Sequence, residues 1–189
     1  MDRFRRRILF LLAAASVGGC AVNQAPATAT MKAIEQPSAA DVAWLDALAP
    51  KAIAWMAEQE AALLKQGRPL TAEEIGIARR MGVQTPEKIR LLVLAEFPFP
   101  SDPLLAAEAR AIGFGSGKEG GRSMGYAVLV KPQFRGARWL LAHECVHIAQ
   151  RERLGLEGFI RRYLLEMRTA GYEHSPLEAE ANRLMQAAQ

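Results

Sequence analysis

The hydrophobic positions of this chain recur with a helical period over much of its length. From residue 41 onward, apolar side chains follow one another at intervals of three and four residues, the spacing of one face of an α-helix. They are Trp44, Leu45, Leu48, Ala52, Trp55, Met56 and Leu63. Pro50 lies within this run, and we expect a junction there because proline interrupts helical hydrogen bonding.

Shorter segments follow with alternating signals for helix and strand. A second helix is predicted from Thr71 to Met81, since Thr71 and a glutamate three residues later form a capping-box pattern. Residues 88–95 and 123–131 are rich in branched apolar residues and end at prolines, which is typical of strands. A short helix is expected between them, over residues 103–112.

The C-terminal third returns to helical patterns. Residues 138–154 contain no proline or glycine and stop at Gly155, a common residue after a helix. The last helix begins after Ser175, a good N-cap, with Pro176 at its first position. The order of helices, strand, helix, strand and three helices predicts a single α+β domain over residues 41–189. It is helix-rich, with a small sheet packed on helix 138–154.

Helix 138–154 contains the sequence His-Glu-Cys-Val-His, from His143 to His147. Two histidines four residues apart lie on one helical face, so both imidazoles can reach one metal ion. Glu144 stands beside the first histidine, where a carboxylate can take a proton from a water molecule activated by the metal. We therefore expect His143 and His147 to bind Zn²⁺ and Glu144 to be the catalytic base.

A catalytic zinc ion needs a third protein ligand. A histidine soon after the motif is excluded, because Gln150 and Arg153 occupy the glycine and histidine positions of the pattern HExxHxxGxxH. Glu178, in the first turn of the last helix, is the predicted ligand, and Glu180 is the alternative. Ser175-x-x-Glu178 is also a capping-box pattern, in which Glu178 would only satisfy a backbone N–H.

Asn182 follows Glu178 by four residues, so its amide can support a ligand from one helical turn away. The motif together with a downstream glutamate resembles the zincin metalloproteases of the glutamate-ligand type, the broad group that includes thermolysin. That group has aspartate where this chain has Asn182, so the negative charge at this position is missing. The resemblance implies a zincin-like fold around a zinc site.

A narrower resemblance, to uncharacterised bacterial metallopeptidases, covers residues 88–185. It supports the fold and the metal site and implies no substrate. The matching positions are Gly125-Tyr126, Leu141 to Glu144, Gln150, Glu152 to Gly155, Tyr163-Leu164, Gly171-Tyr172 and Pro176 to Glu178.

Hydrolysis of an amide also needs a second donor for the oxyanion. Tyr172 and His174, just before the last helix, are candidates, and Tyr163 and Tyr126 are two more. In zincins the strand before the motif helix is often a sheet edge that pairs with an extended peptide. The resemblance therefore implies this role for residues 126–130.

Two other features invite a chemical reading that the sequence does not support. The glycine-rich segment 113–121 is not a phosphate loop, because Glu119 stands where serine or threonine must bind magnesium. We expect a mobile loop that borders the cleft. Cys145 lies about 200° round the helix from the histidines, since the helical repeat is ~3.6 residues, and we expect it to pack as a small hydrophobe.

The N-terminus has the features of an export signal over residues 1–19. A basic segment precedes ten apolar residues, too few for the ~20 that span a bilayer. Val17-Gly-Gly-Cys20 matches a lipoprotein cleavage box, so Cys20 is the expected lipidation site. Residues 20–40 predict a lipidated cysteine and a flexible tether. The lack of aspartate after Cys20 favours the outer membrane, facing the periplasm.

Removal of the signal changes the charge of the chain. Four of the 24 basic and one of the 20 acidic residues lie in residues 1–19, which leaves 20 basic and 19 acidic residues. The mature chain has no block of like charge, so no nucleic acid is expected as a partner.

These features together predict a membrane-anchored, zinc-dependent hydrolase of the bacterial cell envelope. The favoured reading is a metallopeptidase that acts on a peptide or protein substrate. Two alternatives stay open. One is a non-catalytic assembly or scaffold lipoprotein that retains a zincin fold, and the other is an amidase that acts on peptidoglycan.

Overall fold

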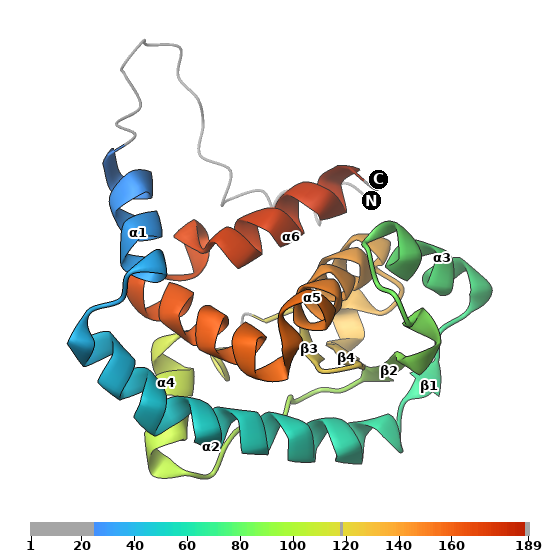
Figure 1. Ribbon diagram of the computed structural model, residues 1–189. Helices are drawn as coiled ribbons and strands as arrows, with labels where there is room; N and C mark the ends of the chain where they lie inside the picture. Colours follow the sequence, from blue (N-terminus) through green and yellow to red (C-terminus); the bar gives the residue numbers. More distant parts are fainter. Residues whose placement is uncertain (1–24, 118, 188–189) are drawn as a thin grey trace.

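The computed structural model describes residues 25–117 and 119–187, and it has the α+β order expected from the sequence (Figure 1). The elements are α1 (Ala25–Glu35), α2 (Ala39–Leu64), β1 (Arg68–Pro69), α3 (Ala72–Arg80), η2 (Pro86–Lys88), β2 (Arg90–Val93), α4 (Pro103–Ala111), β3 (Gly121–Met124), β4 (Ala127–Val130), η3 (Pro132–Phe134), α5 (Arg138–Thr169), η4 (Tyr172–His174) and α6 (Pro176–Ala187). The predicted export signal and the lipidation site Cys20 lie outside the described residues. None of the described helices combines the length and the apolar character needed to cross a bilayer.

Much of the segment that we expected to be an irregular tether is helical. α1 occupies Ala25–Glu35, and α2 already begins at Ala39. Ile34 is 4% exposed and belongs to the same apolar cluster as Leu164 and Leu165 of α5. Alanine, methionine, lysine and glutamate favour a helix, and the buried isoleucine adds a tertiary contact that local periodicity does not reveal.

α2 runs without interruption through Pro50, so the junction expected there is absent from the described chain. A proline inside a helix removes one backbone hydrogen bond and crowds the preceding turn. The residues on both sides of it are buried, with Leu48 and Ala49 fully covered and Ala52 7% exposed. Packing of this face against the rest of the domain offsets the local cost.

α3 has the cap that the sequence predicted. Thr71 Oγ1 accepts a hydrogen bond from the backbone N–H of Glu74, and the Glu74 carboxylate accepts one from the backbone N–H of Thr71. Ile77 and Ala78 of this helix are buried in one cluster with residues of α5. α3 therefore supports α5 from the side.

The four strands form a mixed sheet in the order β1-β2-β4-β3. β2 and β4 are parallel, whereas β3 and β4 form an antiparallel hairpin. The single strand predicted for residues 123–131 is thus two strands that turn at Gly125, where φ is +64°. A Cβ on Gly125 would lie 2.0 Å from the carboxyl carbon of Glu60, so the turn requires glycine for space as well as for conformation.

The topology overturns one expectation about the substrate. β4 has hydrogen-bonded neighbours on both sides, so residues 126–130 are not an edge that a peptide could join. The prediction treated one long strand as the last before the motif helix and missed the reversal at Gly125. The edge strand of this hairpin is β3.

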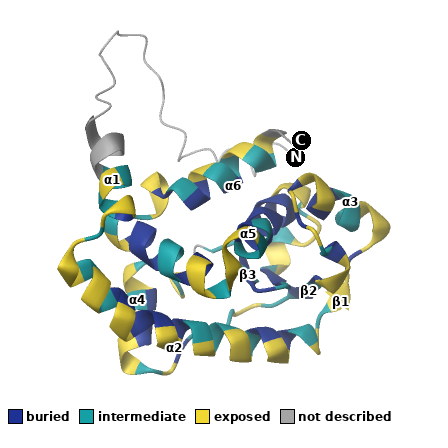
Figure 2. Cartoon of the chain, in the orientation of Figure 1, coloured by how far each residue is buried: buried dark blue, intermediate teal, exposed yellow. Residues whose placement is uncertain are grey.

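α5 packs against β3 and β4 and contains the motif in its first half. The backbone leaves the helical region at Gly155, with φ 73° and ψ 164°, so two helices meet there at a kink, at the boundary expected from the sequence. The middle of its first half, residues 140–148, is buried throughout (Figure 2). Its apolar residues, among them Cys145 and Val146, share a core with Val128 of β4. α6 packs on the same helix.

Candidate metal centre

The two histidines of the motif lie side by side in the interior of the domain. His143 and His147 are 8% and 7% exposed, and their Nε2 atoms are 3.1 Å apart. Glu144 is 4% exposed and lines the same cleft as both histidines. One helical turn thus brings the three side chains of the motif to one place.

Glu178 reaches this place from α6. Its Oε2 is 3.3 Å from Nε2 of His143, and its Oε1 is 3.5 Å from Nε2 of His147. The residue is 2% exposed. Among the side chains that the structure describes, Glu178 Oε2 is a buried oxygen with no hydrogen-bond partner. A buried carboxylate oxygen without a partner is costly, and a cation between the three side chains would satisfy it.

The spacing of the three donor groups fits a shared ion. One ligand atom from each of His143, His147 and Glu178 lies within 4.8 Å of the others. Two donors bonded at 2.0–2.1 Å to one tetrahedral zinc ion are about 3.3 Å apart. The separations of 3.1, 3.3 and 3.5 Å lie close to this value. This buried His-His-Glu group can therefore hold a metal ion.

Electrostatics in the metal-free site also favour a cation. Burial raises the pKa of Glu178, but the two neighbouring imidazoles outweigh it and hold that pKa well below its usual range. Burial lowers the pKa of His147, but Glu178 and Glu144 outweigh it and raise the value to about 9. Burial also raises the pKa of Glu144, which the two histidines oppose only in part. The negative charge of the carboxylates thus stabilises a positive charge in this cluster.

A second buried glutamate explains why Glu178 lies where it does. Glu166 is fully buried, and its Oε2 accepts hydrogen bonds from Ser175 Oγ at 2.6 Å and from the backbone N–H of Leu177 at 2.9 Å. Ser175 Oγ in turn accepts from the backbone N–H of Glu178 at 3.2 Å. Ser175 therefore caps α6, but the Glu178 carboxylate turns to the histidines instead of closing a capping box. Sequence reasoning missed Glu166, because nothing local marks a helical glutamate as buried.

Glu180, the alternative ligand, is held away from the histidines. Its carboxylate accepts two hydrogen bonds from the Arg153 guanidinium, at 3.1 and 2.9 Å. Arg153 occupies the position where a third histidine would stand in the other ligand pattern. Its contact with Glu180 holds that carboxylate at the surface of α6.

Gln150 connects this pair to His147, and sequence reasoning missed its role. Its Nε2 donates to the Leu177 carbonyl at 2.9 Å and to Glu180 Oε2 at 3.0 Å. Because both amide hydrogens are used, Oε1 must accept from Nδ1 of His147, 2.8 Å away. In the neutral imidazole this leaves the lone pair on Nε2, the atom that faces the other two ligands.

The structure does not show the support expected from Asn182. This residue lines the cleft beside the metal ligands, yet within the described part of the chain no hydrogen bond joins its amide to either histidine. The supporting amide is that of Gln150, on the same helix as His147. Glu178 and Asn182 share one face of α6, but Nδ1 of His147 contacts Gln150 of its own helix.

Of the four candidate oxyanion donors, two line the cleft and two do not. Tyr163 and Tyr172 line the cleft, and the Tyr163 ring meets that of His147 edge to face, with centroids 6.4 Å apart. His174 is exposed and is not among the residues that line the cleft, so its assignment is not supported. The Tyr126 hydroxyl is 2.9 Å from both Glu152 and Thr85, so it is occupied away from the site.

Burial is the first cause that raises the pKa of both remaining tyrosines, and the Glu178 carboxylate adds to it. Tyr163 and Tyr172 therefore stay protonated and can donate a hydrogen bond at neutral pH. The pKa of the Cys145 thiol is also raised by burial, and the side chain is fully covered within the core, as expected for a packing residue.

Glu144 lies directly against the edge strand. A Cβ on Gly121 of β3 would approach Glu144 Oε1 to 2.8 Å, so a side chain at this position would displace the carboxylate. A hydrogen bond from the backbone of Ser123 slightly opposes the rise in the pKa of Glu144. Gly121 is a site residue that the sequence did not reveal, because it reads as the end of a glycine-rich loop.

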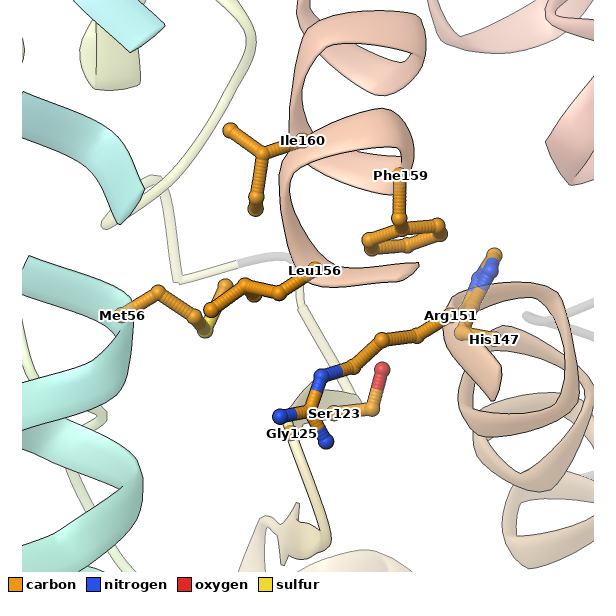
Figure 3. Close-up of a pocket in the computed structure, with 8 residues that line it drawn as sticks. All are labelled: Met56, Ser123, Gly125, His147, Arg151, Leu156, Phe159 and Ile160. Carbon is orange, nitrogen blue, oxygen red and sulfur yellow. The ribbon is translucent and has the colours of Figure 1, made fainter. Parts of the chain in front are cut away.

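The kink at Gly155 packs apolar side chains against His147. Figure 3 shows Leu156, Phe159 and Ile160, which follow the kink, around a small space that Met56 of α2 also borders. Its volume is about 10 Å³, enough for about one water molecule. The Phe159 and His147 ring centroids are 6.4 Å apart. This packing shields His147 on the side of the kink.

Comparison of the chain with protein-family models, with curated proteins and with solved structures finds no match. The function must therefore be argued from the geometry of the site.

Proposed function

We propose that this protein is a zinc-dependent metallopeptidase with a zincin-like fold. The proposal is carried by one observation: His143, His147 and Glu178 converge from two helices beside the buried carboxylate of Glu144. Two imidazole nitrogens and one carboxylate are a common ligand set of catalytic zinc. The motif helix against a small sheet, with a third ligand from a later helix, supports the fold assignment.

Zinc, when bound, supplies a Lewis acid that polarises the scissile carbonyl and lowers the pKa of a water molecule. The chain's own residues do the rest. Glu144 takes a proton from the attacking water and later delivers it to the leaving amine. Burial raises the pKa of Glu144, which makes its carboxylate a better proton acceptor. Tyr163 and Tyr172 are the donors available for the oxyanion.

A peptide substrate is proposed to pair with β3. This strand is the free edge of the hairpin, and Gly121 and Ser123 line the cleft beside Glu144. Backbone pairing would hold an extended chain next to the metal ligands without a demand on its side chains.

The location is a separate proposal that rests on the N-terminal sequence. Cys20 carries lipid and anchors the enzyme in the bacterial cell envelope, at the outer membrane facing the periplasm. Metabolic labelling with radioactive palmitate, of the wild type and of Cys20→Ser, tests it. Label that persists in Cys20→Ser, or that is missing from both, contradicts the anchor.

The test of the enzymatic function separates metal binding from turnover. The purified protein is expected to hold about one zinc ion per chain and to hydrolyse peptides in a library. Glu144→Gln should keep the zinc but slow hydrolysis by about 10²–10⁴-fold, because it removes the general base. Glu157→Gln, an exposed position on the same helix, is the matched control and should leave both unchanged. Absence of zinc, or full turnover in Glu144→Gln, refutes the proposal and favours a non-catalytic role.

A further inference from the structure

The cleft that contains the metal ligands is much larger than the site itself. Its volume is about 720 Å³, and it extends from Glu144 and Glu178 towards α2 and α4. A protein cavity of roughly 150 Å³ encloses one benzene ring. The cleft therefore has room for several large side chains, whereas the proposed catalytic step needs space only for one amide bond.

The walls of the cleft are mainly apolar and come from three helices. The residues that define them are Trp55 and Met56 of α2, Leu105 and Ile112 of α4 and its end, and Phe159 and Ile160 of α5. Most of these side chains are buried or half-buried within the domain. Such walls favour apolar surface over polar groups, since each polar group that enters loses hydrogen bonds to water.

The charged residues along these walls already have hydrogen-bond partners within the protein. Arg122 is 7% exposed, donates to Glu119 through Nε at 2.9 Å and to the Pro98 carbonyl at 2.7 Å, and stacks on the Phe114 ring. Glu108 accepts from the indole N–H of Trp44 at 3.2 Å. Arg122 is thus neutralised by Glu119, whereas the donor to Glu108 is a neutral indole, so this carboxylate would repel acidic groups of a substrate.

We infer that the cleft recognises a run of several apolar side chains in a polypeptide, next to the bond that is cut. The inference rests on the proposed peptidase function and narrows its substrate class. Disaccharides and acidic stem peptides of peptidoglycan present many hydroxyl and carboxylate groups, for which these mainly apolar walls hold few partners. The edge strand β3 beside the cleft pairs with a peptide backbone and gives no such contact to a lipid chain.

Binding to the inactive protein tests the inference without any need for turnover. Zinc-loaded Glu144→Gln is titrated with two fluorescein-labelled peptides that have identical polar flanks. The central residues of one are Leu-Phe-Leu-Phe, and those of the other are Ser-Asn-Ser-Asn. Fluorescence anisotropy should show that the apolar peptide binds at least about 100-fold more tightly. Equal affinities overturn the inference, and so does palmitate that binds more tightly than the apolar peptide.

A second test compares a tryptophan that fills the cleft with one on the exposed side of the same helix. Ala109 of α4 lines the cleft and is 6% exposed, whereas Ala107 on the same helix is exposed. Ala109→Trp in the Glu144→Gln background should weaken binding of the apolar peptide by at least about tenfold, and Ala107→Trp should not. Equal binding by the two variants overturns the inference.

A second pair covers the case in which circular dichroism shows that Ala109→Trp is unfolded. Ala52→Trp in the wall and Ala54→Trp on the exposed face of α2 then make the same comparison, and equal binding by them overturns the inference too. Hydrolysis of both peptides by the wild type separates the two proposals. Cleavage of both peptides without preference would support the peptidase function and overturn the apolar substrate class. Selective binding of the apolar peptide without cleavage would support the apolar ligand class and overturn the peptidase function.

Discussion

Two buried glutamates, twelve residues apart, stand in opposite situations. Glu166 is fully covered, and both of its oxygens have donors: Arg162, Ser175 Oγ and the backbone N–H of Leu177. Glu178 is almost as buried, but its Oε2 has no hydrogen-bond partner, and its nearest neighbours are two imidazoles. The Glu166 carboxylate is fully hydrogen-bonded within the fold, whereas the Glu178 carboxylate has an oxygen that could still bind a metal ion.

The difference separates a structural acid from a ligand. A folded chain rarely leaves a buried charged oxygen unsatisfied unless something outside the chain completes it. Glu166 fixes the start of α6 through Ser175 and Leu177, and this places Glu178 one turn later against the histidines. The hydrogen bonds of Glu166 thus hold Glu178 where its carboxylate can bind a metal ion.

The largest loss of stability is expected on replacement of Glu166, whose carboxylate oxygens both have hydrogen-bond donors. Glu166→Ala leaves Arg162 and the start of α6 without their acceptor, so the free energy of unfolding should fall by about 3–5 kcal/mol. Urea unfolding of the metal-free protein measures it. Glu157→Ala, at an exposed position of α5, should change it by no more than about 0.5 kcal/mol. Similar values for the two variants would mean that Glu166 is not the anchor described here.

Glu178→Gln should have the opposite profile. It removes the only charged ligand, so zinc affinity should drop by more than about 100-fold. The metal-free protein should lose about 1–3 kcal/mol at neutral pH, less than in Glu166→Ala, because glutamine keeps the size of the side chain but loses the attraction between the carboxylate and the two imidazoles. Zinc titration against a chelating dye and urea unfolding give the two numbers. Glu173→Gln, exposed in η4, is the control. A large loss of stability without loss of zinc would reverse the assignment of the two glutamates.

The pH dependence of the metal-free protein follows from the same cluster. The folded-state pKa of Glu178 lies well below its usual range, so its contribution is present above about pH 4.5 and is lost as the pH falls. The pKa of His147 is raised to about 9, so its contribution is complete below about pH 6.5 and is lost as the pH rises through 9. Stability should therefore be highest between these limits.

Urea unfolding at pH 6 and pH 9 should differ by about 3 kcal/mol in favour of pH 6. His147→Gln should flatten this alkaline decline, since it removes the titrating group. Stability that increases towards pH 9 in the wild type would contradict the coupling between His147 and Glu178. Saturating zinc should abolish the decline, because the metal binds neutral imidazole.

The sequence predicts what is local and misses what depends on the crossing of elements. His143, His147 and Glu144 follow from helical spacing alone, and Ser175 and Pro176 mark the helix that contains Glu178. The hairpin of β3 and β4 was missed because Gly125 stands inside one apolar run, and its turn depends on Glu60 of a distant helix. α1 was missed because its only described anchor is one buried isoleucine.

The residue that orients His147 could not be predicted from local sequence either. Its replacement should have the smallest of the effects considered, a modest loss of zinc affinity. The sequence pointed to Asn182 because it lies one turn from Glu178, whereas the structure gives the role to Gln150, which also contacts α6 at Leu177. Gln150→Ala should weaken zinc binding by about tenfold, since the His147 ring loses its orientation, and Asn182→Ala should change it by less than about threefold.

Zinc titration of the two variants beside the wild type decides between them. Gln150→Glu is a third arm that keeps an acceptor for His147 Nδ1 but loses the amide donors to Leu177 and Glu180. It should recover most of the affinity if orientation of His147 is what Gln150 provides. If Asn182→Ala costs more than Gln150→Ala, the histidine is supported from α6, and the hydrogen bond from His147 to Gln150 only packs the two helices together.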